Sequence, residues 1–304
     1  MARATVSHRL VAVLAGLVVL ACCACAPQAS TTPGTGPALS PVALDLVTGS
    51  GDQPAREQQL DVAEERLTQR CMTARGLTYL RHEPLPPNGS DEERAADLPR
   101  RRTVGYGLGS SGGGQPPPDP DAGEPAYERA LFGDPRHRQE LRLPDGSLHT
   151  FPGDGCIAQS RTELYGDVNR WARVVSVPPV IDNVLRDRTR EAPALTRANA
   201  RWTSCMAAAG FPYPTPEAAI EDLSAAYTGH GSTPALRARE TATAVADGEC
   251  AIRAHVPAAD LAVRREAARS LPAEQREELN ELATLQCAAS QHATRITGHS
   301  APVC

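Results

Sequence analysis

The nine cysteines of this 304-residue chain fall into two groups, and their spacing is the strongest constraint on its fold. Three crowd near the N-terminus, and six are scattered far apart through the rest of the chain. Outside the cytoplasm, where the surroundings are oxidising, an even set of scattered cysteines indicates a disulfide framework. The six disulfide candidates are Cys71, Cys156, Cys205, Cys250, Cys287 and Cys304.

Six cysteines can pair in many ways, and spacing alone does not choose among them. We favour the sequential pairing, Cys71 with Cys156, Cys205 with Cys250, and Cys287 with Cys304. Zinc is disfavoured because the six scattered cysteines include no C-x₂-C pair and no histidine lies at finger spacing from a cysteine pair, so we expect no metal site. A reactive thiol at Cys156 stays open, because this residue lies at a predicted helix start, where the helix dipole favours a thiolate.

The first 21 residues predict an export signal. Arg3 and Arg9 precede an apolar run from Leu10 to Leu20, which is too short to span a bilayer. The sequence Val19-Leu20-Ala21-Cys22 then resembles the lipobox of bacterial lipoproteins, in which the cysteine is acylated and becomes the new N-terminus. Processing at Cys25, an ordinary secreted protein and an uncleaved anchor are the alternatives.

Lipidation of Cys22 would place the protein outside the cytoplasm, on the outer face of the cell membrane. The membrane is thus one expected partner, through acyl chains that each gain about 0.8 kcal/mol per buried CH₂. A cell-wall or envelope-protein partner is the second expectation. Nucleic acid is not expected as a partner, because 31 basic residues, all of them arginine, face 36 acidic ones and the net charge is -5.

Composition divides the chain into four segments: the signal at 1–21, a tether at 22–54, an N-terminal half at 55–175 and a helical C-terminal half at 176–304. The tether is rich in Pro, Gly, Ser and Thr, a composition that buries little apolar surface. Residues 83–125 are dominated by Pro, Gly, Asp and Arg, and predict a long irregular loop. Pro178-Pro179 is expected to end a helix near the boundary between the halves.

The remaining pattern predicts a mainly α fold, braced by disulfides, with one short β-hairpin. The hairpin is expected where Pro144-Asp145-Gly146-Ser147 forms a turn between two short extended segments. Thr215-Pro216 and Thr233-Pro234 each combine a capping hydroxyl with proline at the first helical position, and therefore predict helix starts. Other helices are expected over residues 55–75, after Gly155, around 195–209, and over 258–271 and 273–296.

One motif occurs twice. Cys71-Met72-x-x-x-Gly76-x-x-Tyr79 returns as Cys205-Met206-x-x-x-Gly210-x-x-Tyr213. A duplicated binding unit is one interpretation. A repeated way of joining a helix end to a neighbouring segment is the other, and we favour it because disulfide, glycine cap and aromatic packing each have a structural reason.

These motifs also carry a resemblance to a family. Trp202-x-x-Cys205-Met206-x-x-x-Gly210, followed by Glu240 and Ala244-Val245-Ala246-Asp247-x-x-Cys250, is similar to uncharacterised exported lipoproteins of GC-rich Gram-positive (actinobacterial) bacteria. Cys71-Met72, Gly105-Tyr106-Gly107 and Gly155-Cys156 resemble the N-terminal half of the same proteins. The resemblance implies a shared fold, and it implies no catalytic residues.

Several short motifs resemble functional sites but lack the necessary context. Gly107 to Gly112 matches a dinucleotide fingerprint, and Gly109 to Gly113 a nucleophile elbow, yet glycines and prolines follow where a helix is required. Asp119-x-Asp121-x-Gly123 begins like a calcium loop, but Ala130 stands where a bidentate acid is needed. Arg100 to Arg102 is a charged run that is usually solvated, with anionic cell-wall polymer as the alternative contact. We therefore expect no cofactor and assign no catalytic residue.

The sequence favours a non-catalytic binding or scaffold module of the cell envelope. The alternative is a cell-wall-acting hydrolase or a thiol-dependent enzyme, which would require converging acids or an unpaired Cys156. A transporter's solute-binding protein is disfavoured because alternating strand and helix patterns are missing.

Overall fold

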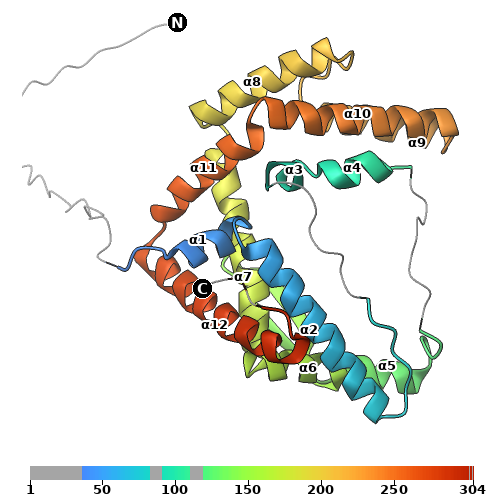
Figure 1. Cartoon of the computed structure of the whole chain (residues 1–304), viewed down its shortest axis with the longest axis vertical. Coiled ribbons are helices and arrows are strands. Elements are labelled where there is room, and N and C mark those ends of the chain that lie inside the picture. The colour runs from blue at the N-terminus through green and yellow to red at the C-terminus, as the bar shows by residue number, and fades with distance from the viewer. Residues whose placement is uncertain (1–35, 83–90, 110–118, 301, 303) are drawn as a thin grey trace, which may run out of the picture. The chain divides into compact units, whose positions relative to one another are not determined.

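A computed structural model describes residues 36–82, 91–109, 119–300, 302 and 304 (Figure 1). The predicted signal, the lipobox at Cys22, and Cys23 and Cys25 lie outside the described residues. The described chain is mainly helical with one antiparallel hairpin, which confirms the predicted fold class. None of the helices in the described ranges is both long and apolar enough to cross a membrane.

The elements follow one another from α1 near the start of the described chain to α12 near its end. The helices are α1 Pro41–Thr48, α2 Gln53–Ala74, α3 Asp91–Ala95, α4 Leu98–Val104, α5 Pro125–Phe132, α6 Gly155–Tyr165, α7 Val168–Thr189, α8 Pro193–Ala208, α9 Pro216–His230, α10 Pro234–Arg253, α11 Val256–Arg269 and α12 Ala273–Thr297. The strands are β1 Arg138–Arg142 and β2 Leu148–Pro152.

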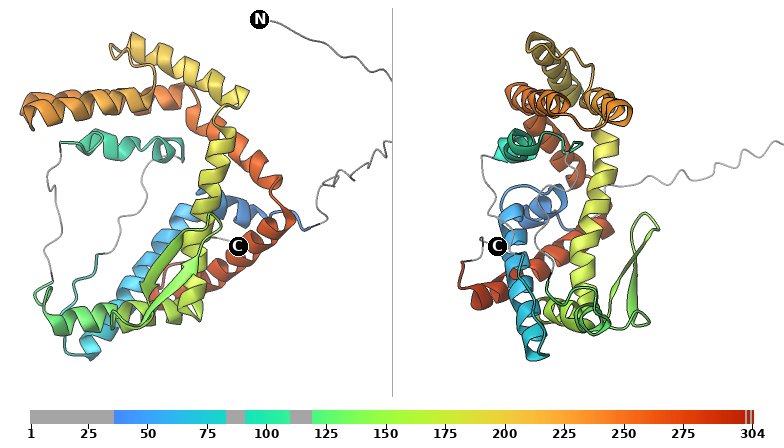
Figure 2. Two further views of the ribbon diagram at one scale, coloured as in Figure 1. Left: turned by 180° about the vertical axis from the view of Figure 1, so that it is seen from behind. Right: turned by 90° about the vertical axis from the view of Figure 1, so that its right-hand side faces the viewer.

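The main hydrophobic core lies among α1, α2, α6, α7, α11 and α12, which pack against one another (Figure 2). Its centre includes Leu185, Leu279 and Leu282, all fully buried. Each fully buried Leu contributes about 1.5–3 kcal/mol relative to an exposed one. A smaller cluster, centred on Trp202 and Met206, joins α8 to α10.

Local signals set several element boundaries where they were predicted. The hydroxyl of Thr215 accepts a hydrogen bond from the backbone N–H of Ala218 at 3.2 Å, and that of Thr233 accepts one from Leu236 at 3.1 Å. In the hairpin turn, the Asp145 carboxylate accepts from the N–H of Ser147 at 2.9 Å. These bonds join residues two or three positions apart, so the sequence carries them directly.

The tether predicted over 22–54 is wrong for its second half, because α1 folds there and enters the core. Ser40 caps α1 by accepting a hydrogen bond from Ala43 N–H at 3.1 Å. Leu44 and Val47 are buried against the long helices. Composition misled here because few apolar residues suffice when they share one face of a short helix that packs on a large core.

The boundary predicted at 175/176 is also wrong. Helix α7 runs through both Pro178 and Pro179, and residues 35–304 form one compact unit. A proline inside a helix removes a backbone hydrogen bond and costs about 3 kcal/mol. Burial of Val177, Ile181 and Leu185 on the same helix offsets that cost.

The irregular loop predicted over 83–125 contains three helical segments, the short helices α3 and α4 and the start of α5. The segment after α4 is bound by Glu240 of α10, whose carboxylate accepts from the N–H groups of Leu108 at 2.7 Å and Gly109 at 3.1 Å. Glu240 is only 2% exposed. Gly109 of the fingerprint-like motif thus serves a close approach, since a Cβ there would collide with the Tyr227 hydroxyl, and residues 110–112 of the motif lie outside the described part.

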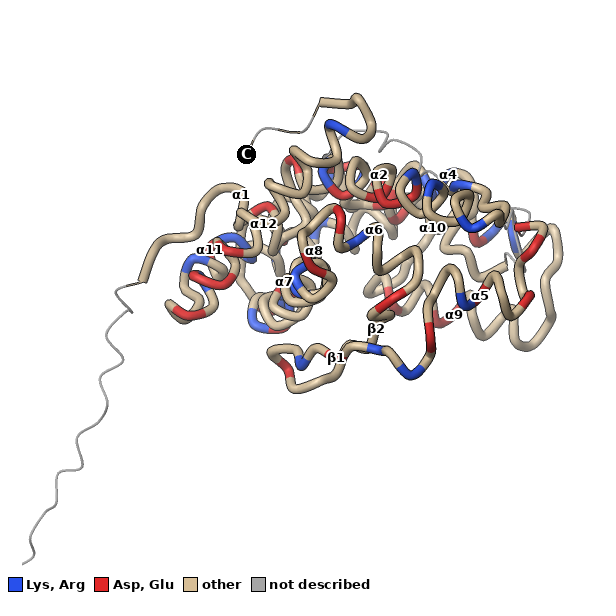
Figure 3. The backbone as a smooth tube through the Cα atoms, turned by 90° about the horizontal axis from the view of Figure 1, so that it is seen from below, with Lys and Arg blue, Asp and Glu red and all other residues tan. Residues whose placement is uncertain are grey.

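In the arginine run on α4, among the basic positions in Figure 3, Arg101 is largely buried, whereas Arg100 and Arg102 are half exposed. Arg101 pairs with the buried Asp247 of α10, which also accepts from Trp202 Nε1 at 2.9 Å. Arg100 pairs with Asp97 at 2.7 Å. The Arg101–Asp247 pair joins α4 to α10, and the Trp202–Asp247 hydrogen bond joins α8 to α10. Two distant residues of the family-like pattern, Trp202 and Asp247, are therefore in direct contact.

The aspartates of the calcium-like motif hold a neighbouring segment instead. Asp121 accepts from the N–H of Thr78 at 3.3 Å, and Asp119 accepts from the N–H of Leu80 and from the hydroxyl of Tyr127. Both carboxylates are therefore occupied by protein donors.

Three disulfides join the six scattered cysteines in the sequential pairing, Cys71–Cys156, Cys205–Cys250 and Cys287–Cys304. The first links α2 to α6 and the second links α8 to α10. Cys156 is fully buried and bonded, so the thiol that a cysteine-dependent enzyme requires is absent at this position.

The two copies of the Cys-Met motif end their helices with the same hydrogen bonds. Leu77 N–H donates to the Met72 carbonyl at 3.1 Å, and Phe211 N–H donates to the Met206 carbonyl at 2.9 Å. Gly76 and its counterpart in the second copy both adopt positive φ, the conformation that this type of helix end requires. The shared geometry agrees with a repeated way of joining a helix end to its neighbour.

Removing a disulfide should destabilise the protein more when that disulfide closes a longer loop of chain. Cys71 and Cys156 are 85 positions apart, and Cys287 and Cys304 are 17 apart. Loop-closure entropy predicts that the double variant C71A/C156A loses about 1.5 kcal/mol more unfolding free energy than C287A/C304A. Urea denaturation of both variants measures this, and an equal or reversed loss would contradict it.

Candidate functional site

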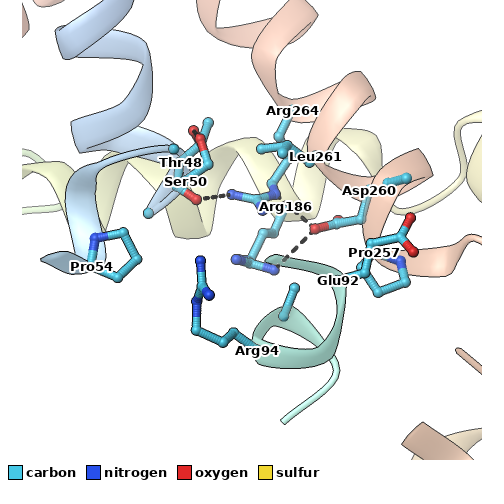
Figure 4. Close-up of a pocket in the computed structure, with 14 residues that line it drawn as sticks. Thr48, Ser50, Pro54, Glu92, Arg94, Arg186, Pro257, Asp260, Leu261 and Arg264 are labelled. Atoms are coloured by element: carbon cyan, nitrogen blue, oxygen red, sulfur yellow. Dashed lines mark hydrogen bonds and ion pairs between the residues drawn. The ribbon is translucent and has the colours of Figure 1, made fainter. Parts of the chain in front are cut away.

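A pocket of about 410 Å³ lies where the turn between α1 and α2 meets α3, α7 and α11 (Figure 4). Three arginines from three different helices line it, Arg94 of α3, Arg186 of α7 and Arg264 of α11. Two acids, Glu92 and Asp260, complete its charged lining. We call this site the arginine pocket.

Arg264 forms the buried base of the arginine pocket. Its guanidinium donates to Asp182 at 2.6 Å, to Asp260 at 2.9 Å and to the backbone carbonyl of Thr48 at 3.1 Å. The side chain is 6% exposed. A buried charge is tolerated only when its donors are matched in this way, so Arg264 fixes α7, α11 and the end of α1 relative to one another.

Arg186 and Arg94 reach the pocket from opposite sides. Arg186 donates to Asp182 at 2.8 Å and to Asp260 at 3.4 Å, and half of its side chain is exposed. Figure 4 shows the guanidinium groups of Arg186 and Arg94 pointing toward one another. An anion placed between the two guanidinium groups would accept charge-assisted hydrogen bonds from both.

Two helix N-termini add positive potential to the arginine pocket. Pro54, in the first turn of α2, and Pro257 and Ala258, in the first turn of α11, line the pocket. The N-cap residues of both helices, Asp52 and His255, make no side-chain capping hydrogen bond. The first turns of α2 and α11 therefore both present their partial positive charge toward the pocket.

The turn that leads into α2 is built by glycines. Gly49 and Gly51 have φ angles of +62° and +57°, a region that other residues rarely adopt. Thr48, Gly49, Ser50 and Gly51 all line the pocket. The sequence did contain this signal, because Gly-Ser-Gly-Asp followed by Pro54 is a typical helix start, but the tether composition obscured it.

None of the six disulfide candidates lines the arginine pocket, and Cys22 lies outside the described residues. The pocket arginines were missed because every basic residue of this chain, histidine apart, is arginine, so an individual arginine carries no signal. Within the described residues, no group of three or more His, Cys, Asp or Glu side chains is placed to hold a metal ion.

Loss of Arg264 should unfold the protein far more readily than loss of Arg186. Arg264→Leu leaves Asp182 without its shortest partner, and breaking a buried pair costs about 3–5 kcal/mol. Arg186→Ala removes a half-exposed partner and should cost less than about 1 kcal/mol. Thermal or urea unfolding of both variants tests this, with Arg190→Ala, an exposed residue at the C-cap of α7, as control; equal losses for the two pocket variants would contradict it.

The chain has no match among family models, curated proteins or solved structures. What the arginine pocket binds is therefore inferred from its own volume, its charges and its hydrogen-bond donors.

Proposed function

We propose that this protein is a lipid-anchored binding module of the cell envelope and that its arginine pocket binds a small oxyanion, a carboxylate or a phosphate. The observation that carries the ligand class is the convergence of three guanidinium groups on one pocket. Guanidinium groups form paired, charge-assisted hydrogen bonds with such anions.

The pocket supports this ligand class in three further ways. Its volume of about 410 Å³ falls in the range of small-molecule sites. The N-termini of α2 and α11 border the pocket and add positive potential there. Arg264 is held in place by its buried partners before any ligand arrives, so little conformational entropy is lost there on binding.

Position in the envelope is supported by three sequence and structural features. The lipobox-like sequence ends at Cys22, three disulfides suit an oxidising compartment, and the Cys-Met motifs resemble exported lipoproteins. Helix α1 begins at Pro41, 41 − 22 = 19 positions after Cys22, so at most about 65 Å of extended chain separates this helix from the proposed anchor. The binding module is thus expected close to the membrane surface.

Citrate and inorganic phosphate are suitable probes for the arginine pocket. Isothermal titration calorimetry of the folded protein should detect citrate binding, and Arg186→Ala should weaken it by about 10- to 100-fold through loss of charge-assisted hydrogen bonds. Arg190→Ala, which removes an exposed arginine outside the pocket, should bind as the unchanged protein does. Unaltered citrate affinity in Arg186→Ala would refute the assignment.

Cys22→Ala should release the protein from the membrane. In cells, the unchanged protein should sediment with membranes and incorporate labelled fatty acid, while the variant should lose the label and appear in the medium or remain unprocessed. Cys25→Ala is the matched control, and it should keep both label and location. Continued labelling of Cys22→Ala would contradict the proposed anchor.

A further inference from the structure

A second pocket, of about 260 Å³, lies between α2 and α7 and has the opposite character. Three acids of α2 line it, Glu57, Asp61 and Glu64. Figure 3 shows acidic positions recurring along this helix. Spacings of four and three residues place these acids along one face of α2, over about 10 Å of helix. We call this site the acidic pocket.

The acids keep a net negative charge at the pocket. Arg161 of α6 offsets Glu64, with 2.9 Å between its Nε and the carboxylate, and its guanidinium lies 3.6 Å from the ring centroid of Trp171. Asp61 and Glu57 lie about one and two turns before Glu64 on the same helix. Both are accessible to solvent, and Glu57 accepts a hydrogen bond from the neutral Gln53 side chain at 2.9 Å. An anion would be repelled at this site, whereas a cation would be attracted.

Gln286 of α12 gives an independent sign that a donor belongs in the acidic pocket. It lines the pocket, is 3% exposed, and its Oε1 accepts no hydrogen bond from the described part of the chain. A buried acceptor without a donor is costly, and such groups are rare in folded proteins. A ligand N–H that reached this oxygen would satisfy it.

The two prolines of α7 leave two carbonyls of that helix without their usual helical donors. In an α-helix, the carbonyls of Val174 and Val175 would accept from the N–H groups of residues 178 and 179, but proline has no N–H. Val174, Val175, Pro178 and Pro179 all line the acidic pocket. The acceptors that line the pocket are thus the carboxylates of α2 and the Gln286 side chain of α12.

We propose that the acidic pocket binds an aliphatic primary ammonium ion. The ammonium group has three N–H donors for the acceptors of the pocket and a positive charge for its carboxylates. The carbon chain of such a ligand suits the apolar part of the lining, which includes Leu60, Trp171 and Pro178.

The placement of the acids argues against glycoside hydrolysis at this pocket. Hydrolysis of a glycosidic bond generally uses two carboxyl groups that flank the bond from either side. All acids that line the pocket come from α2, and the facing residues of α7 are apolar. The arrangement is therefore one-sided in charge, as expected for holding a cation rather than for cleaving a bond.

Calorimetric titration of the whole folded chain with n-pentylammonium chloride tests the proposal. Tetramethylammonium has the charge without the N–H donors, and pentan-1-ol has the carbon chain without the charge. Pentylammonium should bind at least about tenfold more tightly than either, because only it matches both properties of the site. Equal affinity for the two ammonium ions would overturn the proposal, since it would show general attraction to an acidic chain.

Two variants separate binding from folding. Gln286→Leu removes the unmatched acceptor, so it should leave the unfolding midpoint unchanged or higher and yet weaken pentylammonium binding about tenfold. Asp61→Asn should weaken binding by a similar factor, while Glu266→Gln, an exposed acid on α11, should have no effect. Unchanged affinity in a folded Gln286→Leu protein would overturn the proposal. Citrate titration of the same variants reports the arginine pocket separately.

Acidity gives a further readout. The pKa of Asp61 is raised to about 6, first by partial burial and then by the charges of Glu57 and Glu65, while Arg161 acts in the opposite direction. Asp61 is thus largely ionised at pH 7 and largely protonated at pH 5. Pentylammonium affinity should fall over this interval, and the fall should be smaller in Asp61→Asn; an identical pH profile in both proteins would count against a role for Asp61.

Discussion

Burial of the Arg264 charge is the constraint on which much of this structure depends. A guanidinium at the base of a pocket is stable only if carboxylates and carbonyls meet its donors, and here they come from α7, from α11 itself and from the end of α1. Satisfying that one group fixes the relative positions of three elements. The arginine pocket then follows, because the turn after α1 and the first turn of α11 are held around the same group.

Helix α2 connects the two pockets and contributes differently to each. Its first turn, with Pro54, borders the arginine pocket, where the positive end of the helix adds to the guanidinium charges. Its next turns carry Glu57, Asp61 and Glu64 toward the acidic pocket. Helix α7 also serves both, through Arg186 at one pocket and the proline pair at the other. Two helices thus present sites of opposite charge within one compact unit.

The proline pair of α7 illustrates how a local defect and a tertiary gain are linked. Proline destabilises a helix interior, and the sequence therefore predicts a break at residue 178. Core contacts of Ile181 and Leu185 hold the helix continuous instead. The two prolines themselves line the acidic pocket, at the point where α7 lacks two backbone N–H donors.

The sequence by itself determined the features that depend on neighbours a few positions apart. Thr215 and Thr233 cap their helices, the Asp145 turn joins the two strands, and the glycines after both Cys-Met pairs end helices, because each bond closes within one turn of chain. Only the tertiary structure decided which distant groups meet. It placed α1 in the core, selected one disulfide pairing among many, and brought Arg94, Arg186 and Arg264 from three helices to one pocket. Such contacts depend on how helices pack, and in a chain with arginine as its only strongly basic residue no local pattern marks which arginines will meet.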